Sequence, residues 1–95
     1  MTITINENKY KIIKDEKDSF NEEEFQIKYT DYFKEFDFIV GDYAYGKLRL
    51  KGFNNKSNRY FNKINDISKL DKYINENCAY GCKYYVLERE KNIEE

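Results

Sequence analysis

The centre of the sequence holds two β-prone runs: Phe38-Ile39-Val40, which ends at Gly41-Asp42, and Lys47-Leu48-Arg49-Leu50-Lys51, which ends at Gly52. The second run alternates strictly between cationic and apolar residues, a period of two that is typical of a half-buried strand. Because successive strand side chains point to opposite faces, Leu48 and Leu50 should face the core and the three cations should share the other face. The two runs together predict a β-hairpin.

The two ends of the sequence predict another hairpin and a closing strand. Residues 3–12 alternate between apolar and polar types on both sides of Asn6-Glu7-Asn8, a stretch that tolerates turn geometry. Near the other end, Tyr84-Tyr85-Val86-Leu87 predicts the last strand. Residues 89–95 are almost wholly charged and are expected to fray.

A first helix has clear start signals. Asn21 is the expected N-cap, acidic residues fill positions 22–24, and Glu24 is placed to complete a capping box. Phe20 and Phe25 fit a hydrophobic staple across this start. The rings at positions 25, 29, 32, 33 and 36 recur at helical spacing. They predict a helix over 22–35 that buries one aromatic face against the sheet.

A second amphipathic helix is predicted behind an Asn65-Asp66 cap. Its apolar residues recur at spacings of three and four, and they are Ile67, Leu70, Ile74 and Cys78, with Gly81 placed to end the helix. The chain, residues 1–95, therefore predicts a single two-layer α+β domain in the order ββαββαβ. We expect a mixed or antiparallel sheet with both helices on one face.

Composition excludes several functional classes. With 95 residues the chain can form one small domain. It contains no histidine, which removes the commonest general base, the commonest transition-metal ligand and every His-dependent nucleophile pair. We therefore expect no enzyme activity, no cofactor and no metal. No run approaches the ~18 apolar residues of a membrane span, and the N-terminus lacks a secretory pattern, so a cytoplasmic location is expected.

Charge is unevenly distributed, although the net charge is only −1. Between positions 43 and 65 there are six basic residues and no acidic one. Between positions 15 and 37 there are nine acidic residues and three lysines. The near-neutral total therefore conceals a basic hairpin and an acidic helix.

The basic hairpin supports our leading hypothesis, a non-enzymatic binding module that contacts RNA, single-stranded DNA or a nucleoprotein. Cations there would neutralise phosphates, and rings would stack on unpaired bases. The candidate binding residues are Asp42, Tyr43, Tyr45, Lys47, Arg49, Lys51 and Phe53. One alternative is an edge strand or solvated sheet face protected by its lysines. Another is an adaptor that binds a charged protein partner without touching nucleic acid.

Two further pairs of residues raise other hypotheses. Cys78 and Cys82 lie close together in the sequence and are expected to be small buried hydrophobes, with redox sensing or a metal shared between subunits as alternatives. Asp37 and Asp42 flank the first central strand. A carboxylate at a hairpin end normally accepts from turn amides, and proton transfer or metal binding is the alternative.

Four strings occur together in the order and approximate spacing of a known family: Asp18-Ser19-Phe20-Asn21, Phe36-Asp37-Phe38-Ile39-Val40-Gly41-Asp42, Leu48-Arg49-Leu50-Lys51-Gly52-Phe53 and Cys78-Ala79-Tyr80-Gly81-Cys82. Over nearly its whole length the sequence resembles the YutD-like family of small bacterial proteins. Ser19 and Ala44 stand where the family pattern has glycine, and Lys47 stands where it has glutamine.

The resemblance implies a compact cytoplasmic α+β domain, of a family that is sometimes labelled a transcriptional regulator and has no established function. It also separates the cations into two groups. Arg49 and Lys51 fall on positions of the family pattern, whereas Lys56, Arg59 and Lys63 lie in a variable loop. The resemblance therefore favours the hairpin over 42–53 as the surface that the family shares.

Overall fold

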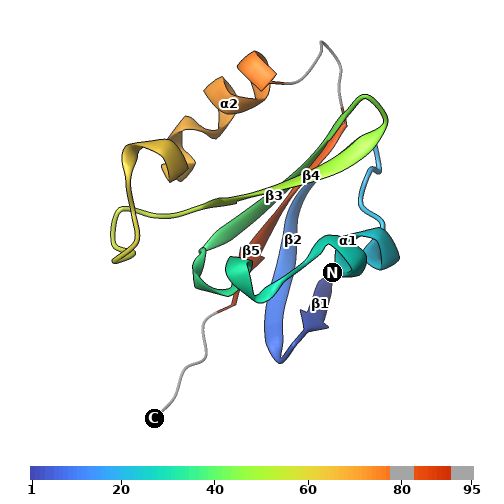
Figure 1. The fold of residues 1–95 in the computed structure, drawn as a ribbon, viewed down its shortest axis with the longest axis horizontal. Helices are drawn as coiled ribbons and strands as arrows, with labels where there is room; N and C mark the ends of the chain where they lie inside the picture. The colour runs from blue at the N-terminus through green and yellow to red at the C-terminus, as the bar shows by residue number, and fades with distance from the viewer. Residues whose placement is uncertain (78–82, 91–95) are drawn as a thin grey trace.

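The computed structural model describes residues 1–77 and 83–90. Figure 1 shows that these residues form a five-stranded antiparallel sheet in the order β1-β2-β5-β3-β4. The strands are β1 (Thr2–Ile5), β2 (Asn8–Glu16), β3 (Phe38–Ala44), β4 (Lys47–Phe53) and β5 (Tyr84–Arg89). The helices are α1 (Glu22–Lys28) and α2 (Leu70–Asn77), with the 3-10 segments η1 (Asp31–Glu35), η2 (Lys63–Asn65) and η3 (Ile67–Lys69). The predicted α+β class, the antiparallel sheet and the order ββαββαβ are confirmed.

Both predicted hairpins are present, and each has a two-residue turn. The φ angles are 50° and 69° at Asn6 and Glu7, and 55° and 76° at Tyr45 and Gly46. Positive φ at both central residues is typical of a type I′ turn, whose twist matches that of the paired strands. The tight second turn lets pairing continue to Ala44↔Lys47, so β3 runs two residues beyond the predicted end at Asp42.

Strand β5 joins the two hairpins into one sheet. It pairs with β2 on one side and with β3 on the other. Its residues Tyr85, Val86 and Leu87 are buried, as expected for a central strand covered on both faces. Arg89 belongs to β5 and donates its backbone N–H to the Asp37 carbonyl at 2.8 Å, so the tail predicted from residue 89 begins too early. Residues 91–95 lie outside the described residues.

The two helices lie on opposite faces of the sheet, and not on one face as predicted (Figure 1). Phe25 of α1 belongs to a core cluster that contains Leu87, whereas Leu70 of α2 packs against a second cluster that contains Val86. Val86 and Leu87 are neighbours in β5 and therefore point to opposite faces. The central strands are apolar on both faces, so each face needs a helix to cover it.

The first helix begins as predicted, although one of its predicted bonds is different. The Asn21 side chain accepts from the Glu24 backbone N–H at 2.9 Å, and the ring centroids of Phe20 and Phe25 lie 5.9 Å apart. Glu24 Oε1, however, accepts a 2.6 Å hydrogen bond from the Tyr43 hydroxyl. The carboxylate that was predicted to close a capping box thus connects α1 to β3.

The same helix ends earlier than predicted, at Lys28 and not at residue 35. Tyr29 adopts an extended conformation, and Thr30 then caps η1 by accepting from the Tyr32 backbone N–H. Tyr29 is buried, with its hydroxyl 3.0 Å from that of Tyr10. Seating this ring in the core breaks the helix, and η1 then carries the remaining rings towards β4.

The second helical region follows its predicted cap. The Asp66 carboxylate accepts from the backbone N–H and the hydroxyl of Ser68 at 3.0 and 2.8 Å, and the hydroxyl bond lowers the pKa of Asp66. Ile67, Leu70 and Ile74 pack against the cluster of β3, β4 and β5, as their spacing predicted. The predicted positions of Cys78, Gly81 and Cys82 lie outside the described residues.

Candidate functional site

Strand β4 places its cations on one face, but the exposed Arg49 side chain is already bound to other groups of the chain. Its Nε donates to Asp42 Oδ1 at 2.8 Å, and its Nη2 donates to the Asn77 carbonyl at 3.1 Å. Asp42 is only 1% exposed, so the guanidinium neutralises a buried carboxylate. Register explains the pair, because Asp42 and Arg49 are direct cross-strand partners. Arg49 therefore ties the hairpin to the last residue of α2.

Lys51 is also engaged, in a different way. Its Nζ lies 4.8 Å from the centroid of the Phe53 ring and 5.8 Å from that of Tyr73. These distances are typical of cation–π contact. Burial lowers the pKa of Lys51, because desolvation disfavours its charged form. Lys51 thus holds its amine over the ring pair, beside the sheet edge.

Of the three rings among the predicted binding residues, one is open to solvent. Phe53 is 1% exposed and belongs to the core cluster on the α2 face. Tyr43 donates to Glu24, and burial together with that bond raises its pKa to about 12. Tyr45 projects fully into solvent from the turn. A buried ring cannot stack on a base without local unfolding, so the predicted set is divided between core and surface.

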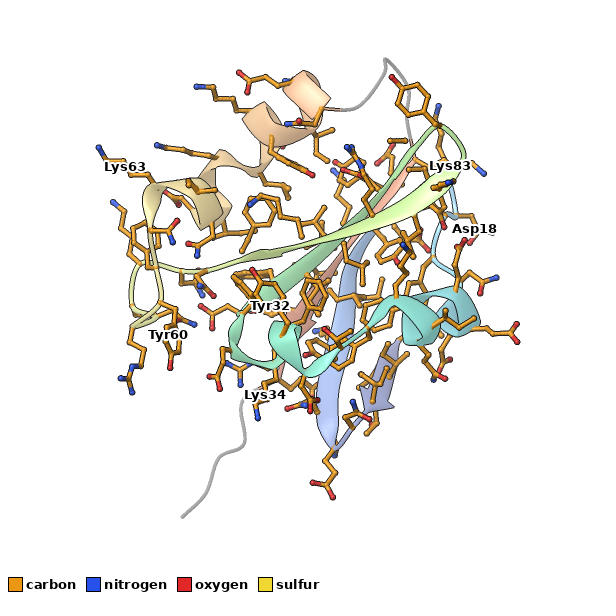
Figure 2. All side chains as sticks on the ribbon, in the orientation of Figure 1. Asp18, Tyr32, Lys34, Tyr60, Lys63 and Lys83 are labelled. Atoms are coloured by element: carbon orange, nitrogen blue, oxygen red, sulfur yellow. The ribbon has the colours of Figure 1, made fainter. Side chains whose placement is uncertain are left out.

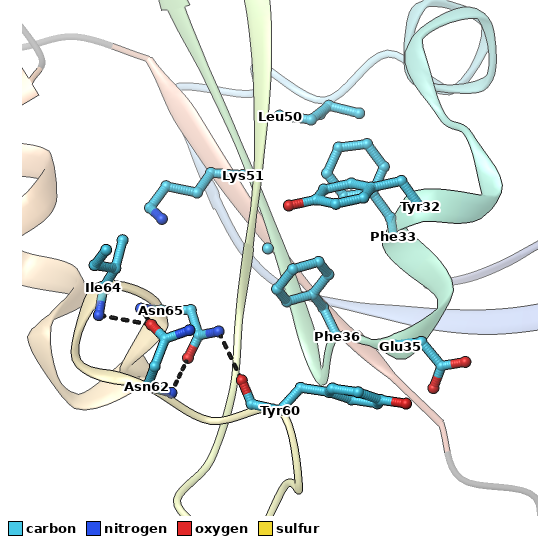
Figure 3. A pocket seen from close by; sticks show the side chains of 11 residues that line it. Tyr32, Phe33, Glu35, Phe36, Leu50, Lys51, Tyr60, Asn62, Ile64 and Asn65 are labelled. Atoms are coloured by element: carbon cyan, nitrogen blue, oxygen red, sulfur yellow. Dashed lines mark hydrogen bonds between the residues drawn. The ribbon is translucent and has the colours of Figure 1, made fainter.

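A groove runs beside the Gly52 end of β4, and we call it the β4 groove. Its volume is about 610 Å³. One wall is formed by Tyr32, Phe33 and Phe36 of η1 and its C-cap. Figure 3 shows β4 crossing the groove with these rings on one side and Asn62, Ile64 and Asn65 on the other, while the Tyr60 side chain lies below Phe36. Leu50, Lys51 and Gly52 form the strand segment between the two walls.

Gly52 makes the aromatic wall possible. A Cβ at this position would lie 2.2 Å from the Phe36 ring, a distance that atoms do not adopt. Phe36 can therefore pack directly against the β4 backbone only because residue 52 is glycine. The ring is half-buried, with its outer edge towards the groove.

The opposite wall is held by a short hydrogen-bond network. Asn62 and Asn65 form a reciprocal capping box around η2. The Asn65 side chain also donates to the Tyr60 carbonyl at 3.1 Å. These bonds fix residues 60–65 without help from a regular helix (Figure 3). The wall is thus preorganised although it is a loop.

Large apolar side chains at the groove are exposed. Tyr32 is 70% exposed and Ile64 is 78% exposed, and Tyr60 is exposed as well. Figure 2 labels Tyr32, Tyr60 and Lys63 among the side chains of the surface. Tyr32 was predicted to lie on a buried helical face, and Ile64 was not singled out, because η1, the loop and β4 are distant in the chain. The sequence signal that could have indicated this surface was Ile64, an isoleucine isolated between polar residues.

Other predicted chemistry can be placed in part. Asp37 is buried and accepts from the Asn55 backbone N–H at 2.9 Å, with Arg89 Nη2 at 3.8 Å from its other oxygen. Among residues 1–77 and 83–90, no three His, Cys, Asp or Glu side chains gather as metal ligands would. Cys78 and Cys82 lie outside these ranges. None of the helices described in these ranges is long and apolar enough to cross a membrane.

Comparison with known proteins identifies the family. Residues 4–88 match the profile of the family described as "Putative antitoxin YutD-like". The chain belongs to the YutD-like family. The family resemblance in the sequence is thereby confirmed.

Two relatives show how far the likeness extends. The protein named "Putative antitoxin YutD" from Bacillus subtilis (strain 168) is 45% identical over 87 residues, which cover 92% of this chain and 96% of that protein. The solution NMR structure of protein yutD from B. subtilis superimposes with a TM-score of 0.82 at 42% identity, over 100% of this chain and 86% of that one. The family and its named relative are described as antitoxins, and neither name is that of an enzyme.

Proposed function

We propose that this YutD-like chain is a cytoplasmic, non-enzymatic regulator of the antitoxin type, which acts by binding a partner protein at the β4 groove. The observation that carries the proposal is the groove itself, where exposed Tyr32 and Ile64 flank an edge strand. Exposed aromatic and aliphatic anchors around a concave site are typical of protein interfaces. The antitoxin names of the family and of its relative supply the class of regulator.

The hairpin cations favour a protein partner over nucleic acid. Arg49 is paired with a buried carboxylate, and Lys51 covers two rings. A phosphate would have to compete with these internal contacts. Phe53 is in the core and offers no free face for a base. Contact with RNA or single-stranded DNA at the seven predicted residues remains a prediction, and it is the competing function.

A growth assay tests the antitoxin role. The tagged chain is isolated from its native host, and proteins that remain bound in stoichiometric amounts are expressed alone in a laboratory bacterium. We expect one of them to arrest growth, and we expect co-expression of this chain to restore it. A Tyr32→Ala variant should restore growth less well, and Tyr45→Ala should behave like the unaltered chain, because Tyr45 is exposed but distant from the groove lining.

A second measurement decides between protein and nucleic acid. Fluorescence anisotropy with short single-stranded RNA and DNA is recorded at about 50 and 200 mM salt. We expect no micromolar binding at either concentration. Binding that weakens with salt and disappears in a Lys47→Ala, Arg49→Ala, Lys51→Ala variant would instead support the nucleic-acid function.

In the growth assay, stoichiometric partners that do not arrest growth would contradict the antitoxin role.

A further inference from the structure

We propose that the β4 groove binds its partner by strand addition, with an extended peptide of alternating apolar and acidic residues pairing along the free edge of β4. The inference rests on the proposed function for the existence of a protein partner. It goes further by naming the peptide chemistry and the backbone groups that recognise it. Strand addition is a recurrent mode of peptide recognition at exposed sheet edges.

The backbone of β4 has unpaired groups on its outer side. β4 is the last strand of the sheet, next to β3 only. Ala44 and Lys47 close a two-residue turn as a hydrogen-bonded pair, and such pairs recur at every second residue of an antiparallel ladder. Leu48, Leu50 and Gly52 therefore direct their N–H and C=O groups away from β3. In the part of the chain that the structure describes, no other segment hydrogen-bonds to these outward groups.

The chain itself already extends this edge by one residue. The Asn54 N–H donates to the Asn65 carbonyl at 2.6 Å, and the Ile67 N–H donates to the Asn54 carbonyl at 3.0 Å. Asn54 and Asp66 thus form an isolated parallel bridge. Asn54 is the next residue in the series of outward groups after Gly52. The edge of β4 therefore already pairs with another segment of the chain at Asn54. The outward backbone groups of Gly52 and Leu50 continue this edge into the groove.

The groove walls predict which side chains the added strand should carry. Leu50 faces the α1 side of the sheet, where η1 provides the aromatic wall. Lys51 faces the α2 side, beside the wall that contains Ile64. Since side chains of a strand alternate between faces, every second residue of the peptide meets rings and the residues between meet Lys51. The sequence of the bound peptide should therefore alternate between apolar residues, which meet the rings, and residues of another type, which meet Lys51.

The charge of the protein around the groove indicates that the peptide residues facing Lys51 should be acidic. The stretch 43–65, which contains β4 and the loop wall, has six basic residues and no acid. Lys63 is exposed and lies in the sequence between the lining residues Asn62 and Ile64. Glu35 is the acidic side chain of the lining, and it comes from the aromatic wall. A glutamate that points towards Lys51 would therefore be favoured over a lysine at the same place.

The test uses a short peptide of alternating valine and glutamate, added to the isotope-labelled full chain and followed by NMR. We expect the amide signals of Leu50 and Gly52 to shift and their exchange with solvent to slow by about tenfold or more. The same peptide with lysine in place of glutamate should bind at least about tenfold more weakly. Unchanged Leu50 and Gly52 amides at saturating peptide would overturn the proposal.

Backbone methylation separates strand addition from simple apolar contact. The N–H groups of alternate residues in a strand point to opposite edges. Two peptides are compared, one with methylated valine nitrogens and one with methylated glutamate nitrogens. Only one of these two sets of N–H groups points towards β4, so we expect one methylated peptide to lose binding and the other to keep it. Equal binding of both methylated peptides would overturn the proposal.

Two matched variants locate the contact on the protein. Ile64→Glu places a carboxylate in the groove, and Ile27→Glu makes the same change on α1 at a residue outside the groove lining. The two side chains are 78% and 79% exposed, so neither change should unfold the chain. We expect about tenfold weaker peptide binding for Ile64→Glu and no change for Ile27→Glu. Equal affinities of the two variants would contradict the groove as the binding place.

The outcomes distinguish this inference from the proposed function. If a growth-arresting partner is found and binds Ile64→Glu as tightly as the unaltered chain, strand addition at β4 is wrong and the antitoxin role stands. If the peptide pairs with β4 and no captured protein arrests growth, the edge site stands and the antitoxin role is wrong. Concentration-dependent changes at Leu50 and Gly52 without peptide would assign the edge to a second copy of this chain, and would also overturn the proposal.

Discussion

At the turn end of β4, Arg49 is held in an ion pair with Asp42, whereas two residues further along the same face Lys51 lies over two rings. Within the part of the chain that the structure describes, Lys51 has no carboxylate within ion-pair distance. The surroundings of Arg49 and Lys51 differ as well. The turn end is closed by a buried carboxylate, and the Gly52 end opens into the groove.

The difference shows that cations of one strand face can have separate roles. Arginine forms directed bonds through a planar group, which suits the tie between Asp42 and the Asn77 carbonyl. Lysine carries a compact charge on a flexible stem, which suits the position of the Lys51 amine over two ring faces. We therefore expect the turn end to tolerate change poorly and the groove end to adapt, and four predictions test this.

The largest effect is expected from a pair of glycine substitutions. In Gly41→Ala the new Cβ would lie 2.3 Å from the Tyr85 ring, which is fully buried and cannot move away. In Gly52→Ala it would meet the half-buried Phe36, which can swing into the groove. We expect losses of about 3 kcal/mol for Gly41→Ala and about 1 kcal/mol for Gly52→Ala in the free energy of unfolding. Urea denaturation measures both, and equal losses would show that the Phe36 wall of the groove is as rigid as the core around Tyr85.

The second prediction concerns the ion pair at the turn end. Arg49→Ala leaves Asp42 buried without its counter-charge, which should cost about 2 kcal/mol of stability. The Asp42→Asn, Arg49→Ala double variant removes the unpaired charge and should recover part of that loss. A double-mutant cycle by urea denaturation gives the coupling energy. Additive losses would mean that Arg49 acts through its bond to Asn77 and not by neutralising Asp42.

A third prediction uses alkaline pH to probe the bond between β3 and α1. Burial and the Glu24 hydrogen bond raise the pKa of Tyr43 from 10.0 to about 12, so the folded state favours the neutral phenol. Its contribution to stability is therefore complete below pH 10 and is lost as pH rises towards 12. Tyr43→Phe should lose stability less steeply with pH over this interval, as measured by denaturant midpoints. Identical slopes would contradict the assignment, because the buried Tyr10 and Tyr85, whose pKa values burial also raises, remain in both proteins.

The sequence could predict the parts of this architecture that depend on local pattern. Strict alternation predicted both hairpins, and Asn21 and Asp66 act as the caps that their residue types indicated. It could not predict which face each helix covers, because that depends on β5 entering between two hairpins that precede it by many residues. The break at Tyr29 was also hidden. It follows from a hydroxyl contact with Tyr10, in a strand distant in sequence.

The candidate site shows the same division. Periodicity correctly placed Lys47, Arg49 and Lys51 on one strand face. Their partners could not be predicted, since Asp42 meets Arg49 through register and Tyr73 reaches Lys51 from α2. Phe53 was expected to stack on bases but follows the alternation into the core. The groove depends on three separate segments and on the missing Cβ of Gly52, none of which is visible as a motif.

The smallest expected effect separates the stem of Lys51 from its charge. Lys51→Met keeps an unbranched side chain over Phe53 and Tyr73, where a thioether makes favourable ring contacts, so we expect stability to change by less than about 0.5 kcal/mol. Lys51→Ala uncovers the rings and should cost about 1 kcal/mol. If the amine serves the groove and not the fold, Lys51→Met should nevertheless bind the valine–glutamate peptide several-fold more weakly. A large stability loss in Lys51→Met, seen in the same urea titration, would mean that the charge holds the sheet together as Arg49 does, and the two ends of β4 would then differ in geometry alone.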